Sequence, residues 1–371
     1  MEQKYIIGIL IAIIITSLIA ISFIFIPRAG LSPSSSDLVA CNTLSFSSEN
    51  AINILFYADK ETAEEYKSQF FKISPLKENE DKFNFYYIDS YRPDCELYKG
   101  IAILCYSKSL IKTSGSCPSD YIVVVNDEHE KSIRSSSYMN ILSLNKKHDS
   151  TVFHHEFGHS FVSLAEEYVP AKIPLASQNC VSSCDEFNGL NDGCFESCSD
   201  SSHYRSIDKG IMRTLKSDSY GTFNSMLISE KIKSLTGSTN YLGITSKTIS
   251  LEGSCSDNSY ALLTISPEFT VLNKEIIKGC ITGTGSGGLQ YQVLDSQGNP
   301  LSDSEFNLNI FTDVELETDF GISGDIYEYE SDFYLPIPLT ENTDKIIISD
   351  NQGEVLLSTS LSNLNNYPCR K

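Results

Sequence analysis

The segment TVFHHEFGHSFVSLAEEY, residues 151–168, carries the most chemically suggestive side chains of this sequence. It contains His-Glu-x-x-His, in which His155 and His159 are four residues apart. On a helix such residues share one face, so both imidazoles can point at one metal ion. Glu156, beside them, can accept a proton from a water molecule that the metal acidifies. The pattern therefore predicts a Zn²⁺ site that hydrolyses peptide bonds, with Glu156 as general base.

The spacing of the histidines does not identify the third metal ligand. Longer motifs of this kind continue with a Gly and a His, but those positions are Val162 and Ala165 here. Two acidic residues follow, Glu166 and Glu167. On a straight helix Glu166 would lie about 10 Å beyond His159 along the axis, too far to share an ion with it. The helix must therefore bend or stop first, although no Gly or Pro marks such a stop.

A wider stretch of sequence resembles a known family. HEFGHSFVSLAEEY resembles the motif of the IgA-peptidase-like zinc metallopeptidases, HEFGHSFxxLADEY. The segments INILFYAD, KFNFYYIDS and YIVVVND are similar to the family's strands, and GIMRT, containing Met212, looks like the Met-turn of metzincins. The resemblance spans about residues 50–245. It implies a proteolytic, metzincin-like α/β domain with Met212 beneath the metal.

The resemblance also assigns roles to the motif residues. It implies that His155 and His159 are zinc ligands and that Glu156 is the general base. In a related protease pattern an Asp ligand precedes the motif tyrosine, and alignment places Glu166 at that position. Glu166 is therefore the predicted third ligand, with Glu167 as the alternative. By analogy with the family, residues 135–145 are an edge strand that binds the substrate backbone.

The remaining histidines are not expected to bind metal. His154 would point about 100° away from His155 on the helix. We expect His129, His148 and His203 at the surface.

Eleven cysteines suggest disulfides and an oxidising compartment, and their odd number leaves at least one free or paired with another chain. Within the insertion 176–200, Cys180, Cys184, Cys194 and Cys198 follow the spacing Cys-x3-Cys-x9-Cys-x3-Cys. This spacing predicts two short helices joined by two disulfides, beside the active-site cleft. A structural zinc bound by four thiolates is the alternative.

The beginning of the chain indicates a membrane anchor. Residues 5–26 are apolar and uncharged, long enough to span a hydrocarbon core of about 30 Å. A cleaved signal peptide is the alternative. Residues 27–49, rich in Pro and Ser, are a predicted linker. Together with the cysteines, this organisation predicts a single-pass membrane protein whose catalytic domain is extracytoplasmic.

The remainder divides into two predicted domains. Residues 50–245 alternate strand and helix patterns, as expected of a metallopeptidase domain with a mixed sheet and an active-site helix. Residues 246–371 contain short strand patterns separated by turns, typical of an immunoglobulin-like β-sandwich. The predicted fold is thus an N-terminal transmembrane helix, an α/β metzincin-like domain and an all-β sandwich.

The formal net charge of −20 argues against a nucleic-acid partner. The favoured hypothesis is a membrane-anchored zinc metalloendopeptidase acting on a protein or peptide. One alternative is an inactive surface-binding protein with a degenerate protease domain and an adhesive sandwich. Another is a purely structural zinc, which would leave Glu156 without a role. The sequence indicates neither the substrate nor the oligomeric state.

Overall fold

Strands dominate the part of the chain that the structure describes. The computed structural model contains nineteen strands but only four α-helices and three short 3₁₀ helices in this part. The described residues are 39–190, 192–237, 258–281, 285–315 and 322–364.

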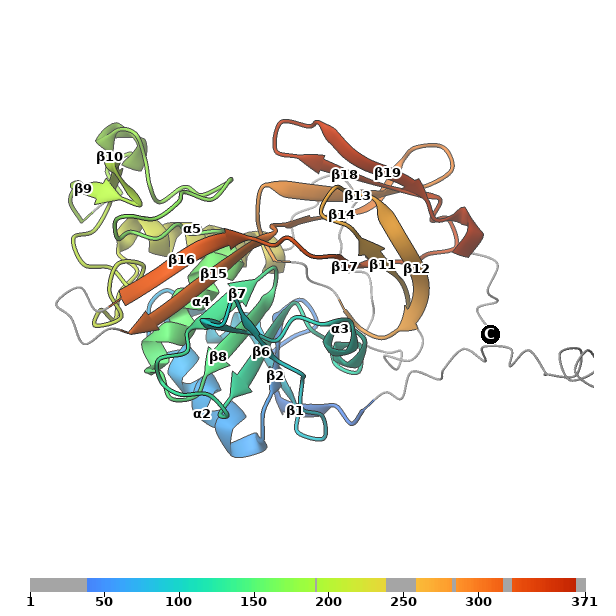
Figure 1. The fold of residues 1–371 in the computed structure, drawn as a ribbon, viewed down its shortest axis with the longest axis horizontal. Coiled ribbons are helices and arrows are strands. Elements are labelled where there is room, and N and C mark those ends of the chain that lie inside the picture. The colour runs from blue at the N-terminus through green and yellow to red at the C-terminus, as the bar shows by residue number, and fades with distance from the viewer. Residues whose placement is uncertain (1–38, 191, 238–257, 282–284, 316–321, 365–371) are drawn as a thin grey trace, which may run out of the picture. The chain divides into compact units, whose positions relative to one another are not determined.

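The largest element is an eight-stranded sheet (Figure 1). Its order is β1 (Asn42–Ser45), β3 (Phe83–Ile88), β2 (Ile52–Tyr57), β6 (Tyr121–Asn126), β8 (Ile141–Asn145), β7 (Ser135–Tyr138), β15 (Asn309–Glu315) and β16 (Ile322–Glu328). The four strands β3, β2, β6 and β8 are parallel, and the flanking strands are antiparallel. All residues of β2 and β3 are buried, as expected where both faces of a sheet are covered.

Helices cover one face of this sheet. They are α2 (Lys60–Phe70), α4 (Ser150–Val162) and α5 (Thr222–Thr236). Aromatic side chains fill the space between helices and strands, and Phe70 of α2 packs edge-to-face on Phe157 of α4 with ring centroids 4.9 Å apart. The helix α4 is buried on all sides from Val152 to Phe161. An enclosed helix of this kind holds its side chains in fixed positions.

Two sheets from the C-terminal half of the chain, residues 258–364, cover the other face of the eight-stranded sheet. A three-stranded sheet has the order β12 (Val271–Lys278), β11 (Ser259–Ile265) and β17 (Phe333–Pro338). A four-stranded sheet has the order β14 (Pro300–Phe306), β13 (Leu289–Leu294), β18 (Lys345–Asp350) and β19 (Val355–Ser360). Leu262 of β11 and Ile348 of β18 belong to the same hydrophobic core as Leu55 of β2 and Ile122 of β6. The C-terminal strands therefore share a core with the first sheet.

Smaller elements complete the fold. They are α3 (Lys108–Ser114), the pair β4 (Glu96–Tyr98) and β5 (Ala102–Leu104), the pair β9 (Phe195–Cys198) and β10 (Asp200–Arg205), and the 3₁₀ helices η1 (Lys77–Lys82), η2 (Cys184–Phe187) and η3 (Ser362–Leu364).

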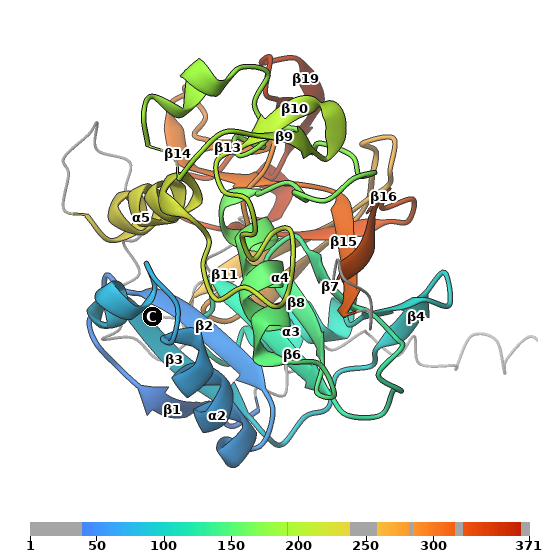
Figure 2. The same cartoon turned by 90° about the vertical axis from the view of Figure 1, so that its left-hand side faces the viewer.

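The predicted fold class is wrong. We expected an α/β metzincin-like domain followed by a separate immunoglobulin-like sandwich, but the described chain is mostly sheet and the C-terminal half is not self-contained. The hairpin β15–β16 leaves the C-terminal sheets and extends the first sheet, with Ile310 opposite Tyr138 and Phe311 opposite Ser137 (Figure 2). The sequence pattern predicts a strand at residues 306–312, which include Ile310 and Phe311, but it carries no information on the partner strand, because alternation of side chains is the same in any half-buried sheet.

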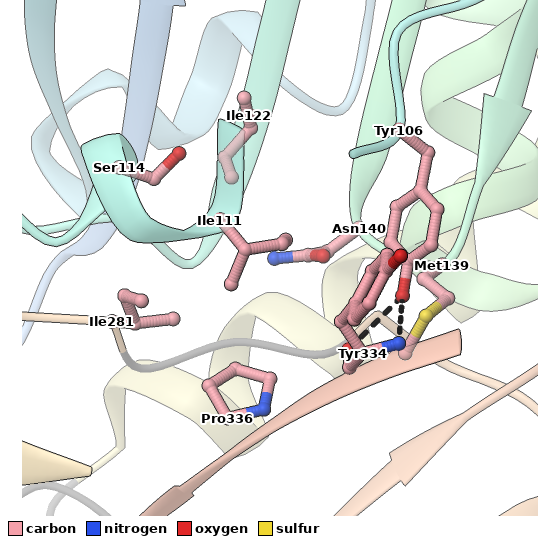
Figure 3. A pocket seen from close by; sticks show the side chains of 9 residues that line it. All are labelled: Tyr106, Ile111, Ser114, Ile122, Met139, Asn140, Ile281, Tyr334 and Pro336. Carbon is pink, nitrogen blue, oxygen red and sulfur yellow. Dashed lines mark hydrogen bonds between the residues drawn. The ribbon is translucent and has the colours of Figure 1, made fainter. Parts of the chain in front are cut away.

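Close contacts between Tyr106 and β17 link the N-terminal and C-terminal halves of the chain. The Tyr106 hydroxyl donates to the Tyr334 carbonyl at 3.0 Å and accepts from the Tyr334 N–H at 2.6 Å (Figure 3). The cavity beside these contacts has a volume of only about 10 Å³. It can hold a water molecule but no organic ligand.

The predicted anchor, residues 5–26, lies outside the described residues, as does the linker up to residue 38. Among the described residues, no helix is both long enough and apolar enough to cross a membrane.

Candidate metal centre

The helix α4 brings the two motif histidines together. The Nε2 atoms of His155 and His159 are 2.9 Å apart. The Nδ1 atom of His155 lies 2.9 Å from the Ile211 carbonyl oxygen, and that of His159 lies 2.6 Å from the Leu164 carbonyl oxygen. A carbonyl only accepts, so each Nδ1 must carry the hydrogen. In the neutral rings the Nε2 lone pairs then face the centre, as in metal-binding histidines.

The helix α4 ends at Val162, although neither Gly nor Pro marks a stop there. Ser163 adopts φ 53° and ψ 39°, in the left-handed region, and its N–H donates to the His159 carbonyl at 3.0 Å. The Leu164 N–H donates to the Gly158 carbonyl at 3.2 Å. These bonds close the last turn and reverse the chain. A left-handed serine thus does here what glycine usually does.

This reversal places Glu166 beneath the two imidazoles. Its carboxylate oxygens lie 3.3 Å from Nε2 of His155 and 3.0 Å from Nε2 of His159. One donor atom from each of these residues lies within 4.8 Å of the others, and all three side chains have an exposed fraction of 0%. Together His155, His159 and Glu166 can hold a metal ion.

The chemistry of these donors fits a divalent cation. Two imidazole lone pairs and one carboxylate converge, and three acceptors at this distance repel one another unless positive charge lies between them. Tetrahedral ligands at about 2.1 Å from zinc are about 3.4 Å apart. The Nε2–Nε2 separation is 2.9 Å, and the two Glu166 oxygens lie 3.0 Å from His159 Nε2 (Oε1) and 3.3 Å from His155 Nε2 (Oε2), all near that value.

Glu167, the alternative third ligand, points elsewhere. Its Oε1 accepts from Nδ2 of Asn224 at 2.8 Å and from Nδ2 of Asn179 at 3.2 Å. Burial raises the pKa of Glu167 to about 7, against the opposing effect of these hydrogen bonds. The side chain therefore joins three segments of the fold, and it is not part of the cluster formed by the histidines and Glu166.

Glu156 lies on α4 next to His155 and is fully buried. Its role as general base stays a prediction.

The segment containing Met212 supports the centre through its backbone. The Ile211 carbonyl accepts from His155, and the Met212 carbonyl accepts from the Glu167 N–H at 2.9 Å. Met212 is fully buried, and its Sδ would lie 2.9 Å from a Cβ built on Gly158. Glycine at position 158 therefore lets this segment approach α4 closely.

The other histidines serve the fold. His154 is buried, and its ring nitrogens lie 3.2 Å from the carbonyl oxygens of Ser150 and Phe70. The expectation that His148 is a surface residue is wrong: only 9% of it is exposed, and its Nδ1 lies 2.9 Å from Oγ of Ser135.

The cysteine insertion forms two nested disulfides, Cys180–Cys198 and Cys184–Cys194. The disulfide prediction is confirmed, and the four-thiolate zinc is excluded for these residues. The prediction of two helices is wrong, because only Cys184 begins a short 3₁₀ helix and Cys198 ends a strand. The first Cys-x3-Cys pair lies on the side of the loop that begins at Cys180, and the second lies on the side that returns to Cys198, so each disulfide joins the two sides of one loop.

The other described cysteines are also bonded: Cys41 pairs with Cys117, Cys95 pairs with Cys105, and Cys280 is in a disulfide. Cys255 and Cys369 lie outside the described residues.

Two sets of residues at the centre carry no signal in the local sequence. Asn179 and Ser199, on either side of the cysteine loop, bind the backbone of the segment that carries Glu166. From the C-terminal half, Phe311 stacks on the His159 ring, and Ser286 Oγ lies 2.9 Å from Ser163 Oγ. No local pattern pointed to them, because they reach the site through tertiary contacts alone.

No model of a known protein family matches this chain, and no curated protein matches it either.

Proposed function

We propose that this protein is a zinc-dependent peptide hydrolase. The observation that carries the proposal is the buried cluster of His155 Nε2, His159 Nε2 and the Glu166 carboxylate. A second buried carboxylate, that of Glu156, lies on α4 with the two histidines. Two imidazoles and one carboxylate form a donor set used by catalytic zinc, which leaves a fourth position for water or substrate. The resemblance of HEFGHSFVSLAEEY to the IgA-peptidase-like metallopeptidases also supports it.

The chain's own residues divide the work. The side chains that would hold the ion are those of His155, His159 and Glu166. The hydrogen bonds from Nδ1 of each histidine to a backbone carbonyl would fix the orientations of the two imidazoles. When bound, zinc supplies Lewis acidity, which polarises a carbonyl group and acidifies water. Glu156 would accept a proton from the attacking water and donate it to the leaving amine.

The stretch that was predicted to bind the substrate backbone as an edge strand does not lie at an edge of the sheet. The edge of β7, within the predicted substrate-binding stretch 135–145, is paired with β15 from Ser135 to Tyr138. A substrate strand cannot add there while β15 is in place. This pairing and the complete burial of the centre favour the second candidate function, a surface-binding protein that does not hydrolyse peptides.

The proposed location is the outside of a membrane, anchored by residues 5–26. The disulfides support an oxidising compartment. The substrate would be a protein or peptide.

The metal content and the hydrolysis of a peptide library together test the proposal. The wild-type protein should hold one zinc per chain and cleave peptides. Glu156→Gln should keep the zinc and lose about 10²-fold to 10⁴-fold in hydrolysis rate. Bound zinc without hydrolysis in the wild type would support the binding protein, and a chain that holds no zinc would contradict the metal centre itself.

A further inference from the structure

We propose that Asn179 is a positioning residue for the third metal ligand, and that the loop closed by Cys180–Cys198 acts with it as a clamp on residues 165–167. The inference rests on the proposed metal function. The proposed role of Asn179 is to fix the position of Glu166, which lies beyond the end of α4.

Asn179 holds the residue immediately before the ligand. Its side chain is fully buried; Oδ1 accepts from the Ala165 N–H at 2.7 Å and Nδ2 donates to the Ala165 carbonyl at 2.9 Å. One amide therefore satisfies both backbone groups of Ala165, as a neighbouring strand would. Nδ2 also lies 3.2 Å from Oε1 of Glu167, so the same side chain contacts the residues before and after Glu166.

Ser199 holds the ligand residue itself. Its Oγ donates to the Glu166 carbonyl at 2.6 Å, and Cys180 Sγ lies 3.6 Å from the same oxygen. The Glu167 N–H is held in turn by the Met212 carbonyl at 2.9 Å. Three consecutive residues are thus each fixed by a bond to a different segment.

These backbone contacts matter because they, and not hydrogen bonds to the carboxylate, hold Glu166 in place. Among the described residues, no hydrogen-bond donor reaches the Glu166 oxygens; the Nε2 atoms of His155 and His159, at 3.3 and 3.0 Å, present lone pairs to them. The direction of the carboxylate is therefore set by its backbone. A small shift of that backbone would move the carboxylate away from His155 and His159.

The outer disulfide joins the two arms of the clamp. Cys180 directly follows Asn179 and Cys198 directly precedes Ser199, so the Cys180–Cys198 bond keeps the two positioning side chains together. The inner bond, Cys184–Cys194, closes the far part of the same loop. The two disulfides therefore form a matched pair for experiment.

A double-mutant cycle tests the inference with zinc affinity, measured by competition with a chelator, as the readout. Asn179→Ala should weaken zinc binding about 10-fold to 100-fold, as expected for a residue that orients a ligand. In a Glu166→Ala background the same substitution should change affinity less than about threefold, because the ligand it positions is gone. Asn84→Ala is the matched control: Asn84 is also fully buried and binds backbone groups, those of Ser47 and Ser48.

The cycle separates positioning from general stabilisation. Asn84→Ala should lower thermal stability without changing zinc affinity. An equal loss of affinity on Asn179→Ala with and without Glu166, or no loss in either background, would overturn the clamp while leaving a zinc-binding wild type intact. A wild type that binds no zinc would overturn the metal function and the clamp together.

Two further variants cover the case in which Asn179→Ala does not fold. Ser199→Ala removes one hydrogen bond and should weaken zinc binding in the same Glu166-dependent way. Replacing Cys180 and Cys198 together by Ser should also weaken it, whereas replacing Cys184 and Cys194 should leave it within about threefold of the wild type. Equal effects of the two disulfide deletions on zinc affinity would contradict the clamp.

Discussion

Phe311 lies almost flat against His159, with ring centroids 4.2 Å apart and an interplanar angle of 16°. The two residues are far apart in the sequence and meet because β15 pairs with β7, beside α4. The C-terminal half of the chain therefore forms one wall of the candidate metal centre.

This contact gives the first prediction. Phe311→Leu removes the aromatic face that covers His159, so bound zinc should be lost to excess chelator several-fold faster than from the wild type. Phe333→Leu, also fully buried but in β17, is the control. Both variants should lose about 1 kcal/mol of stability, because each changes a packed core side chain. An equal rate of zinc loss in the two variants would show that Phe311 acts only through stability.

The two neighbouring glutamates should differ in their effects. Glu166→Ala removes a metal donor and should weaken zinc binding by at least about 100-fold. Glu167→Ala removes the acceptor of one N–H of Asn179 and of one N–H of Asn224, and it should cost about 1–3 kcal/mol of stability. Calorimetric zinc titration and denaturant unfolding of both variants measure these effects. The reverse order of zinc affinities would make Glu167 the ligand.

The left-handed end of α4 can be tested by comparing two substitutions at one position. Ser163→Gly and Ser163→Ala both remove the hydroxyl that contacts Ser286, but only glycine adopts a positive φ without cost. The Ala variant should therefore be less stable than the Gly variant by about 1 kcal/mol in denaturant unfolding. Equal stabilities would mean that the helix end changes conformation to accommodate alanine.

His154 should make stability depend on pH. Burial lowers the pKa of His154 to about 4, below its ordinary value of 6.5. The unfolded chain then binds the proton more tightly, so the stability contributed by neutral His154 is present above pH 6.5 and is lost as the pH falls toward 4.

The measurement is the free energy of unfolding of the metal-free protein between pH 7 and pH 4. His154→Gln should flatten its dependence on pH relative to the wild type. His203→Gln, at a more exposed histidine, is the control and should leave the dependence unchanged. An unchanged dependence in His154→Gln would show that other groups cause it.

The pairing of the two motif histidines could be predicted from the sequence alone. The spacing of His155 and His159 places two imidazoles on one helical face, because helical periodicity is a local property. Strands β2, β3 and β6 of the first sheet were also recognisable, since continuous apolar runs such as those of β2 and β6 are typical of strands covered on both faces.

How a third side chain comes to lie beside the two histidines could be seen only in the folded chain. Glu166, and not Glu167, lies beside the histidines because of the left-handed conformation of Ser163 and the hydrogen bonds of Asn179 and Ser199. A serine or an asparagine in the sequence predicts neither. The same is true of Phe311, which reaches His159 through strand pairing. Local patterns fix which residues form helices and strands, but the partner of each surface is chosen by packing among segments far apart in the chain.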